Sequence, residues 1–118
     1  VDYLNHISTE HLKENNLSDA KKQLIKITKI DPENSDAHFN LGYIYHQEKD
    51  HQMALDHFKY AIHYTDDMQE AYQLLAIQYL YLNQTENAQL VVRRLFELTN
   101  DPKYMTLNYS IQKLKPKY

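Results

Sequence analysis

The sequence predicts an all-α fold of stacked, antiparallel helix hairpins, and three observations support this prediction. The chain of 118 residues includes one Gly and three Pro, too few for the tight turns that a sheet-rich domain needs. Apolar residues recur in the i, i+3, i+4, i+7 rhythm of amphipathic helices. The sequence also matches itself, without a gap, at a period of 34 residues, which separates Ala20 from Ala54 and Ala54 from Ala88. A period of this length is typical of a helical repeat array.

The period divides the chain into three units, residues 1–34, 35–68 and 69–102, with residues 103–118 left over. Each unit holds two amphipathic helices, so the units and the remaining helix give seven helices in one domain, 1–118. Side chains in equivalent places share their type. The shared columns are Ala20, Ala54 and Ala88; Ile7, Leu41 and Leu75; Ser8, Gly42 and Ala76; Leu24, Phe58 and Val92; Ile27, Ala61 and Leu95. The small residues let two helix backbones approach closely.

The first helix of each unit is expected to end at a polar pair. These pairs are Asn15-Asn16, Lys49-Asp50 and Asn83-Gln84. Asn tolerates the left-handed backbone conformation that often ends a helix. The sequence therefore predicts a sharp turn between the two helices of every unit.

Capping residues mark where the other helices begin. Ser18 and Thr85 are expected to cap the second helices of their units, and Ser35 to cap the first helix after Pro32. Asp67 and Glu70 resemble a capping box.

The segment after Pro102 predicts a capping helix with a polar outer face. Tyr104, Leu107, Ile111 and Leu114 share one helical face, spaced to cover the last unit. The repeat pattern fits best there if the preceding turn, around residues 99–101, holds two extra residues.

Composition argues against several functions. The lone Gly42 excludes a glycine-rich phosphate loop, and the absence of Cys excludes thiolate chemistry and sulfur-bound zinc. A net charge of −3 and a basic cluster no larger than Arg93-Arg94 argue against nucleic-acid binding. No segment approaches the length of a membrane span, so we expect a soluble chain, with the cytoplasm slightly favoured.

The sequence shows no recognisable set of catalytic or metal-binding residues. No nucleophile, base and acid stand in a recognisable order, and we expect no enzyme activity and no cofactor. The histidines form no i, i+4 pair, so we expect scattered surface side chains that gain charge near pH 5–6 rather than a metal site. These are His6, His11, His38, His46, His51, His57 and His63.

The repeat resembles the tetratricopeptide repeat, with the middle unit as its best match. That unit has Leu41, Gly42, Tyr45, Ala54, Phe58 and Ala61 in the places where the family has its signature residues. His38 stands where the family usually has Trp, and Asp66 where it usually has Pro. The resemblance covers residues 1–102 and implies a right-handed α-solenoid whose first helices line a concave groove.

The resemblance also implies which residues line that groove and bind a partner. They are Asn5, Thr9, Phe39, Asn40, Tyr43, His46, Gln73, Leu74, Ile77 and Tyr81. This surface is mostly uncharged and combines apolar area with amides, which suits a largely apolar peptide or helical segment. Chaperone-binding relatives grip a terminal carboxylate with cations, but the equivalent places here hold Asn5, Thr9, Asn40, Glu70 and Leu74, so that clamp is not expected.

The sequence therefore predicts a protein–protein interaction module with a protein or peptide partner. Two alternatives stay open: a structural spacer or self-association unit of a longer protein, and a regulatory arm of an enzyme. Residues 35–68 carry 2 basic and 6 acidic side chains, a net −4, whereas residues 103–118 carry 4 basic and no acidic ones, a net +4. Such an array can associate weakly head to tail or recruit an acidic partner at its basic end, but a solvated capping helix explains the same lysines.

Overall fold

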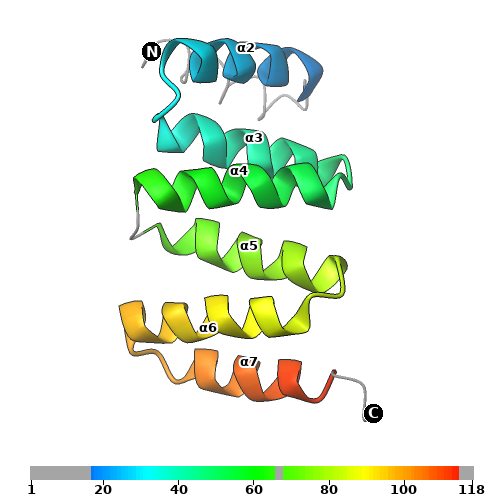
Figure 1. Ribbon diagram of the computed structural model, residues 1–118, viewed down its shortest axis with the longest axis vertical. Helices are drawn as coiled ribbons and strands as arrows, with labels where there is room; N and C mark the ends of the chain where they lie inside the picture. The colour runs from blue at the N-terminus through cyan, green and yellow to red at the C-terminus, as the bar shows by residue number, and fades with distance from the viewer. Residues whose placement is uncertain (1–16, 66–67, 115–118) are drawn as a thin grey trace.

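The structure, a computed structural model, describes residues 17–65 and 68–114. Six helices follow one another as α2 (Leu17–Ile30), α3 (Ser35–Gln47), α4 (His51–Tyr64), α5 (Gln69–Tyr81), α6 (Thr85–Thr99) and α7 (Lys103–Gln112). They stack as antiparallel neighbours along the long axis of a molecule of 47 × 26 × 23 Å (Figure 1). The described residues contain no strand. The predicted all-α solenoid is confirmed, while the first of the seven expected helices lies outside the described residues.

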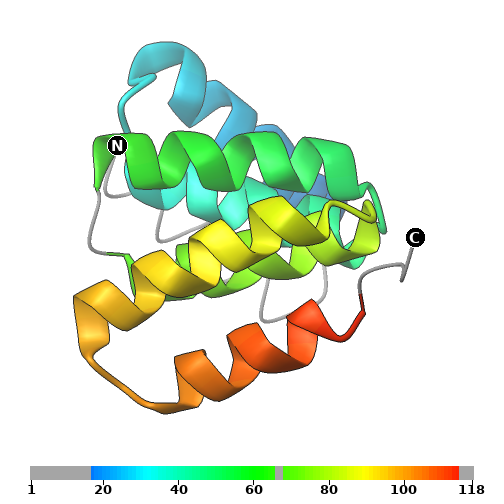
Figure 2. The same ribbon diagram turned by 60° about the horizontal axis from the view of Figure 1, so that its bottom comes forward.

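The repeat period appears directly in the helix boundaries. Helices α3, α5 and α7 begin at Ser35, Gln69 and Lys103, which are equivalent positions one full period apart. The extra residues expected before α7 are therefore absent, and the prediction of a two-residue insertion was wrong. Figure 2 shows α6 and α7 continuing the stack.

The predicted columns of the second helices form the core. In α2, α4 and α6 every member of the Ala20, Leu24 and Ile27 columns is at most 1% exposed. Three apolar clusters result: one joins α2 to α3, one joins α4 to α5, and one joins α5, α6 and α7. Because each cluster spans neighbouring helices, no hairpin buries its apolar face alone.

The turns inside the hairpins repeat the same geometry. Lys49 and Asn83 have positive φ angles of 64° and 60°. In the first turn the Asp50 amide donates to the Tyr45 carbonyl (2.9 Å), and at the equivalent place in the next unit the Gln84 amide donates to the Tyr79 carbonyl (2.8 Å). These bonds satisfy carbonyls at the helix end. The polar pairs at 49–50 and 83–84 thus end their helices as predicted, and the pair at 15–16 lies outside the described residues.

The caps differ from the prediction. Asn34, not Ser35, caps α3, because its side chain accepts from the Ala37 amide at 2.9 Å. Thr85 is the first residue of α6, whose cap position Gln84 makes no side-chain capping bond. Ser18 lies inside the first turn of α2, and Asp67 lies outside the described residues. The starts of α3 and α6 were therefore predicted to within one residue and that of α2 to within two, but the capping atoms were not predicted.

The outer face of α7 also differs from the prediction. Tyr104 and Ile111 are buried, at 3% and 2% exposure, but Leu107 and Leu114 are exposed. Met105 and Tyr109 are exposed as well, at 61% and 63%. Polar side chains such as Thr106 and Ser110 are exposed there too, so the outer face of α7 is mixed and not uniformly polar as expected.

Candidate functional site

The predicted groove residues of α3 and α5 fall into an exposed group and a half-buried group. Tyr43, Ile77 and Tyr81 are exposed, at 39%, 38% and 60%. Phe39, Asn40, His46, Gln73 and Leu74 are half-buried. Asn5 and Thr9 lie outside the described residues. We call the side chains of Phe39, Asn40, Tyr43, Gln73, Ile77 and Tyr81 the first-helix surface.

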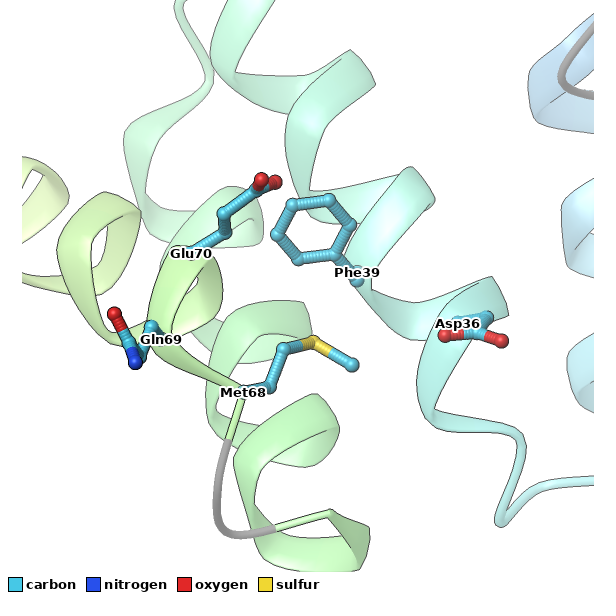
Figure 3. A pocket seen from close by; sticks show the side chains of 5 residues that line it. All are labelled: Asp36, Phe39, Met68, Gln69 and Glu70. Carbon is cyan, nitrogen blue, oxygen red and sulfur yellow. The ribbon is translucent and has the colours of Figure 1, made fainter. Parts of the chain in front are cut away.

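Two hollows adjoin this surface. The first, of about 490 Å³, is lined by Asp36, Phe39, Met68, Gln69 and Glu70, and so lies between α3 and the start of α5. Figure 3 shows the Phe39 ring, the Met68 side chain and the Glu70 carboxylate around one space, with Asp36 at its far side. We call it the α3–α5 hollow.

The second hollow, of about 430 Å³, lies between α5, α6 and α7 and is mainly apolar. Its lining is Gln73, Ala76, Ile77, Leu80, Val92, Leu95, Lys103, Tyr104, Leu107 and Ile111. We call it the α5–α7 hollow. Leu107, which was predicted to lie on the buried face of α7, lines this opening instead.

Some predicted binding residues are engaged inside the protein. The Gln73 amide donates to the Tyr104 hydroxyl at 2.7 Å, which ties α5 to α7. Leu74 packs against the cluster around Phe58, and the Phe39 ring lies 5.7 Å from the Phe58 ring, between centroids. Leu74 therefore contributes to the core, and Phe39 forms a firmly held wall of the α3–α5 hollow.

A buried amide fixes two histidines beside the first-helix surface. Gln78 is fully buried. Its amide nitrogen donates to His46 Nδ1 (3.0 Å) and to the Leu74 carbonyl (3.1 Å), and its oxygen accepts from His51 Nδ1 (2.7 Å). This network assigns a proton to Nδ1 of His51 and leaves Nδ1 of His46 unprotonated. The His51 ring stacks on the Tyr81 ring at 4.1 Å, so Tyr81 is held in place by the same network.

A second histidine pair links α3 and α4. His38 is buried, donates from Nε2 to the Pro32 carbonyl (2.7 Å), and therefore accepts at Nδ1 from His57 Nδ1 (3.1 Å). Burial, followed by the charge of the neighbouring His38, lowers the pKa of His57 to about 4.

The histidines are thus not scattered surface groups, and the sequence prediction was wrong for these four. The expectation that every histidine gains charge near pH 5–6 was also wrong for His57. The pairs 38 with 57 and 46 with 51 each cross a turn, which a search along single helices does not detect. Within the described ranges, no group of three or more His, Asp or Glu side chains could hold a metal ion. None of the helices described there is long and apolar enough to cross a bilayer.

Stacked helix hairpins that recur at one fixed period define an α-helical repeat protein. Residues 24–56 match the family described as "Tetratricopeptide repeat". This match and the recurring helix hairpins support the tetratricopeptide-repeat assignment that the sequence predicted. The repeats of this family serve generally as scaffolds for protein–protein interaction.

Solved structures agree with the fold. One is the first repeat domain of Spaghetti (RPAP3) bound to the HSP90 peptide SRMEEVD, with a TM-score of 0.84, 19% identity, and 95% of this chain and 90% of that chain covered. Another is the TPR2B domain of yeast Sti1 in a complex named for pHsp70, with a TM-score of 0.82, 14% identity, and 97% of both chains covered.

A curated relative is much longer than this chain. The UDP-N-acetylglucosamine–peptide N-acetylglucosaminyltransferase of Giardia intestinalis (strain ATCC 50803 / WB clone C6) is 29% identical over 106 residues. This match covers 90% of the chain but 7% of that relative. The likeness therefore concerns a small part of the enzyme.

Proposed function

We propose that the first-helix surface binds a short, largely apolar peptide or helical segment of a partner protein. The α5–α7 hollow supports this proposal most strongly, because it is an open apolar site beside the exposed side chains of Ile77 and Leu107. An apolar side chain that enters the hollow would remove from water both its own surface and the apolar lining of the hollow. Two structural relatives are named as complexes, one with the HSP90 peptide SRMEEVD and one with pHsp70, which supports a peptide or protein segment as the ligand.

Polar groups on the same surface supply orientation. Asn40 and Tyr43 lie on α3, half-buried and exposed respectively. An amide can pair with a peptide backbone, and a tyrosine combines contact area with a hydroxyl. Because three repeats offer a short surface, we expect a dissociation constant of about micromolar order.

Selection from a display library of random peptides tests this proposal. We expect the parent to enrich binding peptides, and an Asn40→Ala/Tyr43→Ala variant with an unchanged circular dichroism spectrum to lose them. Asn87→Ala/Tyr109→Ala removes the same two residue types from exposed positions on α6 and α7, so it serves as the matched control. Equal binding by the parent and the Asn40/Tyr43 variant would contradict the proposal.

The outer face of α7 favours self-association as a second candidate function. Met105 and Tyr109 lie one helical turn apart and are mostly exposed, and such apolar residues often mark an interface. Sedimentation at increasing concentration tests this: a growing mass that returns to the monomer in Met105→Lys is expected, and a strict monomer would contradict it.

The match to a transferase favours the third hypothesis, a regulatory arm of an enzyme. The length of the encoded polypeptide tests it. An additional domain fused to these repeats is expected, and a polypeptide without one would contradict the hypothesis.

A further inference from the structure

The α3–α5 hollow differs in charge from the rest of the first-helix surface. Asp36 and Glu70 both line it, and its other lining residues, Phe39, Met68 and Gln69, are uncharged. The ion pairs found in the described part of the chain, Lys21–Glu48, Arg94–Glu97 and Lys103–Asp101, involve neither carboxylate. The hollow is therefore negative, with no cation of the described residues neutralising it.

The walls of the hollow suit one long, positively charged side chain. Phe39 is held by its contact with Phe58 and lies beside the Glu70 carboxylate (Figure 3). A cation over the face of such a ring is attracted to it, and the aliphatic stem of Lys or Arg packs on apolar groups such as Met68. The sequence of the middle unit, with its net −4, has the same sign.

We infer that the α3–α5 hollow binds a lysine or arginine side chain of the partner peptide. This inference rests on the proposed function and specifies the chemistry of the partner. The hollow should also disfavour acidic peptides, because Asp36 and Glu70 repel a carboxylate and attract an ammonium or guanidinium group.

The positions of the two hollows imply a spacing in that peptide. Helix α5 lines both hollows, the α3–α5 hollow with Glu70 and the α5–α7 hollow with Ile77. These residues stand seven positions apart in the sequence, about 10 Å along a helix, and an extended peptide advances about 3.3 Å per residue. The basic residue should therefore stand about three positions from an apolar residue that fills the α5–α7 hollow.

Nuclear magnetic resonance titration with single amino-acid derivatives tests the basic site directly. The probes are N-acetyl-arginine amide and N-acetyl-norleucine amide; norleucine has an unbranched apolar side chain and lacks the charged guanidinium group. We expect the arginine probe to shift the signals of Phe39, Met68 and Glu70 and to bind about tenfold more tightly than the norleucine probe. Equal affinity of the two probes would overturn the inference.

Charge-removing variants and salt provide the controls. Asp36→Asn/Glu70→Gln should abolish the preference for the arginine probe, whereas Glu97→Gln, which removes a carboxylate outside the hollow, should leave it unchanged. The parent itself should lose most of the preference between 0.1 M and 1 M salt, because the screening length falls from about 10 Å to about 3 Å. A preference for the arginine probe that persists both at the higher salt concentration and in the Asp36→Asn/Glu70→Gln variant would contradict the inference. The salt test uses the parent protein alone, so it does not depend on the folding of a variant.

The display experiment separates this inference from the proposed function. Enriched peptides that lack Lys and Arg, and that bind Asp36→Asn/Glu70→Gln as well as the parent, would overturn the basic site alone. Failure to obtain any peptide that depends on Asn40 and Tyr43, with the arginine preference intact, would overturn the proposed function alone. The inferred result is a set of peptides with a basic residue about three positions from an apolar one.

Discussion

Gly42 on α3 faces the ring of Phe58 on α4, and a Cβ at Gly42 would stand 2.8 Å from Cδ1 and Cε1 of that ring. In the next unit the equivalent residues are Ala76 and Val92, both buried. The hairpin with the smaller residue on its first helix, Gly42, thus has the larger residue, Phe58, on its second helix. These two hairpins keep their backbones close by matching the two volumes.

Gly42→Ala should therefore destabilise the protein although Ala is the better helix former. Overpacking costs about 1–3 kcal/mol, while the gain in helix propensity is about 1 kcal/mol, so we expect a net loss of about 1 kcal/mol in the free energy of unfolding. Adding Phe58→Val reproduces the pair of the next unit. In urea unfolding, the double variant should be about 1–2 kcal/mol more stable than the sum of the single effects; additive effects would contradict the contact.

Lys49→Gly should stabilise the protein. Lys49 has a φ of 64°, and the left-handed conformation costs a residue with a Cβ about 1 kcal/mol relative to Gly. Asn83 has nearly the same φ of 60°, but Asn tolerates this conformation, so Asn83→Gly should gain much less. Thermal unfolding of both variants measures the difference, and an equal effect of the two substitutions would argue against relief of strain at Lys49.

Acid should weaken the fold through His57. Its pKa is about 4 in the folded protein, below the ordinary histidine pKa of 6.5 that we assign to the unfolded chain, so the unfolded chain binds more protons between these values. The stabilisation from His57 is therefore full above about pH 6.5 and is lost as the pH falls toward 4. The whole shift would correspond to about 3 kcal/mol at 1.36 kcal/mol per unit, and partial exposure reduces our expectation to about 1–2 kcal/mol.

Urea unfolding at pH 7 and pH 5 measures this loss. His57→Gln, which introduces the residue type that Gln23 has at the equivalent position of the first unit, should flatten the dependence on pH. His63→Gln removes an exposed histidine from the same helix and should retain the dependence. The same slope in the parent and His57→Gln would rule out His57 as its source.

Gln78→Leu should destabilise the protein by about 1–3 kcal/mol, because Nδ1 of His46 and the Nδ1 proton of His51 lose their partner. In the parent, nitrogen spectra of the imidazoles at neutral pH should show His46 protonated at Nε2 and His51 at Nδ1. The same tautomer at both rings would contradict the hydrogen-bond network. A stable Gln78→Leu variant with unchanged histidine spectra would also contradict it.

Sequence periodicity predicted the core because burial in a repeat follows spacing along one helix. Ala20, Ala54 and Ala88 could be aligned by their interval, and all three are fully buried. The histidine and glutamine networks could not be predicted in this way. Gln78 meets residues 27 and 32 positions away, and such pairs depend on how helices pack.

The candidate site was predicted only in part for the same reason. The family resemblance selected Tyr43, Ile77 and Tyr81, which are exposed. It did not reveal that Gln73 bonds to Tyr104 or that Leu107 lines a hollow, because both depend on where α7 packs. The α3–α5 hollow has a visible sequence signal, the acids Asp36 and Glu70 at equivalent positions of two units. The sequence prediction used only Glu70, as a residue that opposes a carboxylate ligand.

Chemical-shift mapping of the chain with its most strongly enriched display peptide tests the central claim, binding at the first-helix surface, most directly. We expect the largest changes at Phe39, Tyr43, Gln73 and Ile77, and their loss in the Asn40→Ala/Tyr43→Ala variant. Changes confined to the exposed faces of α4 and α6, with the first-helix surface unaffected, would contradict the claim.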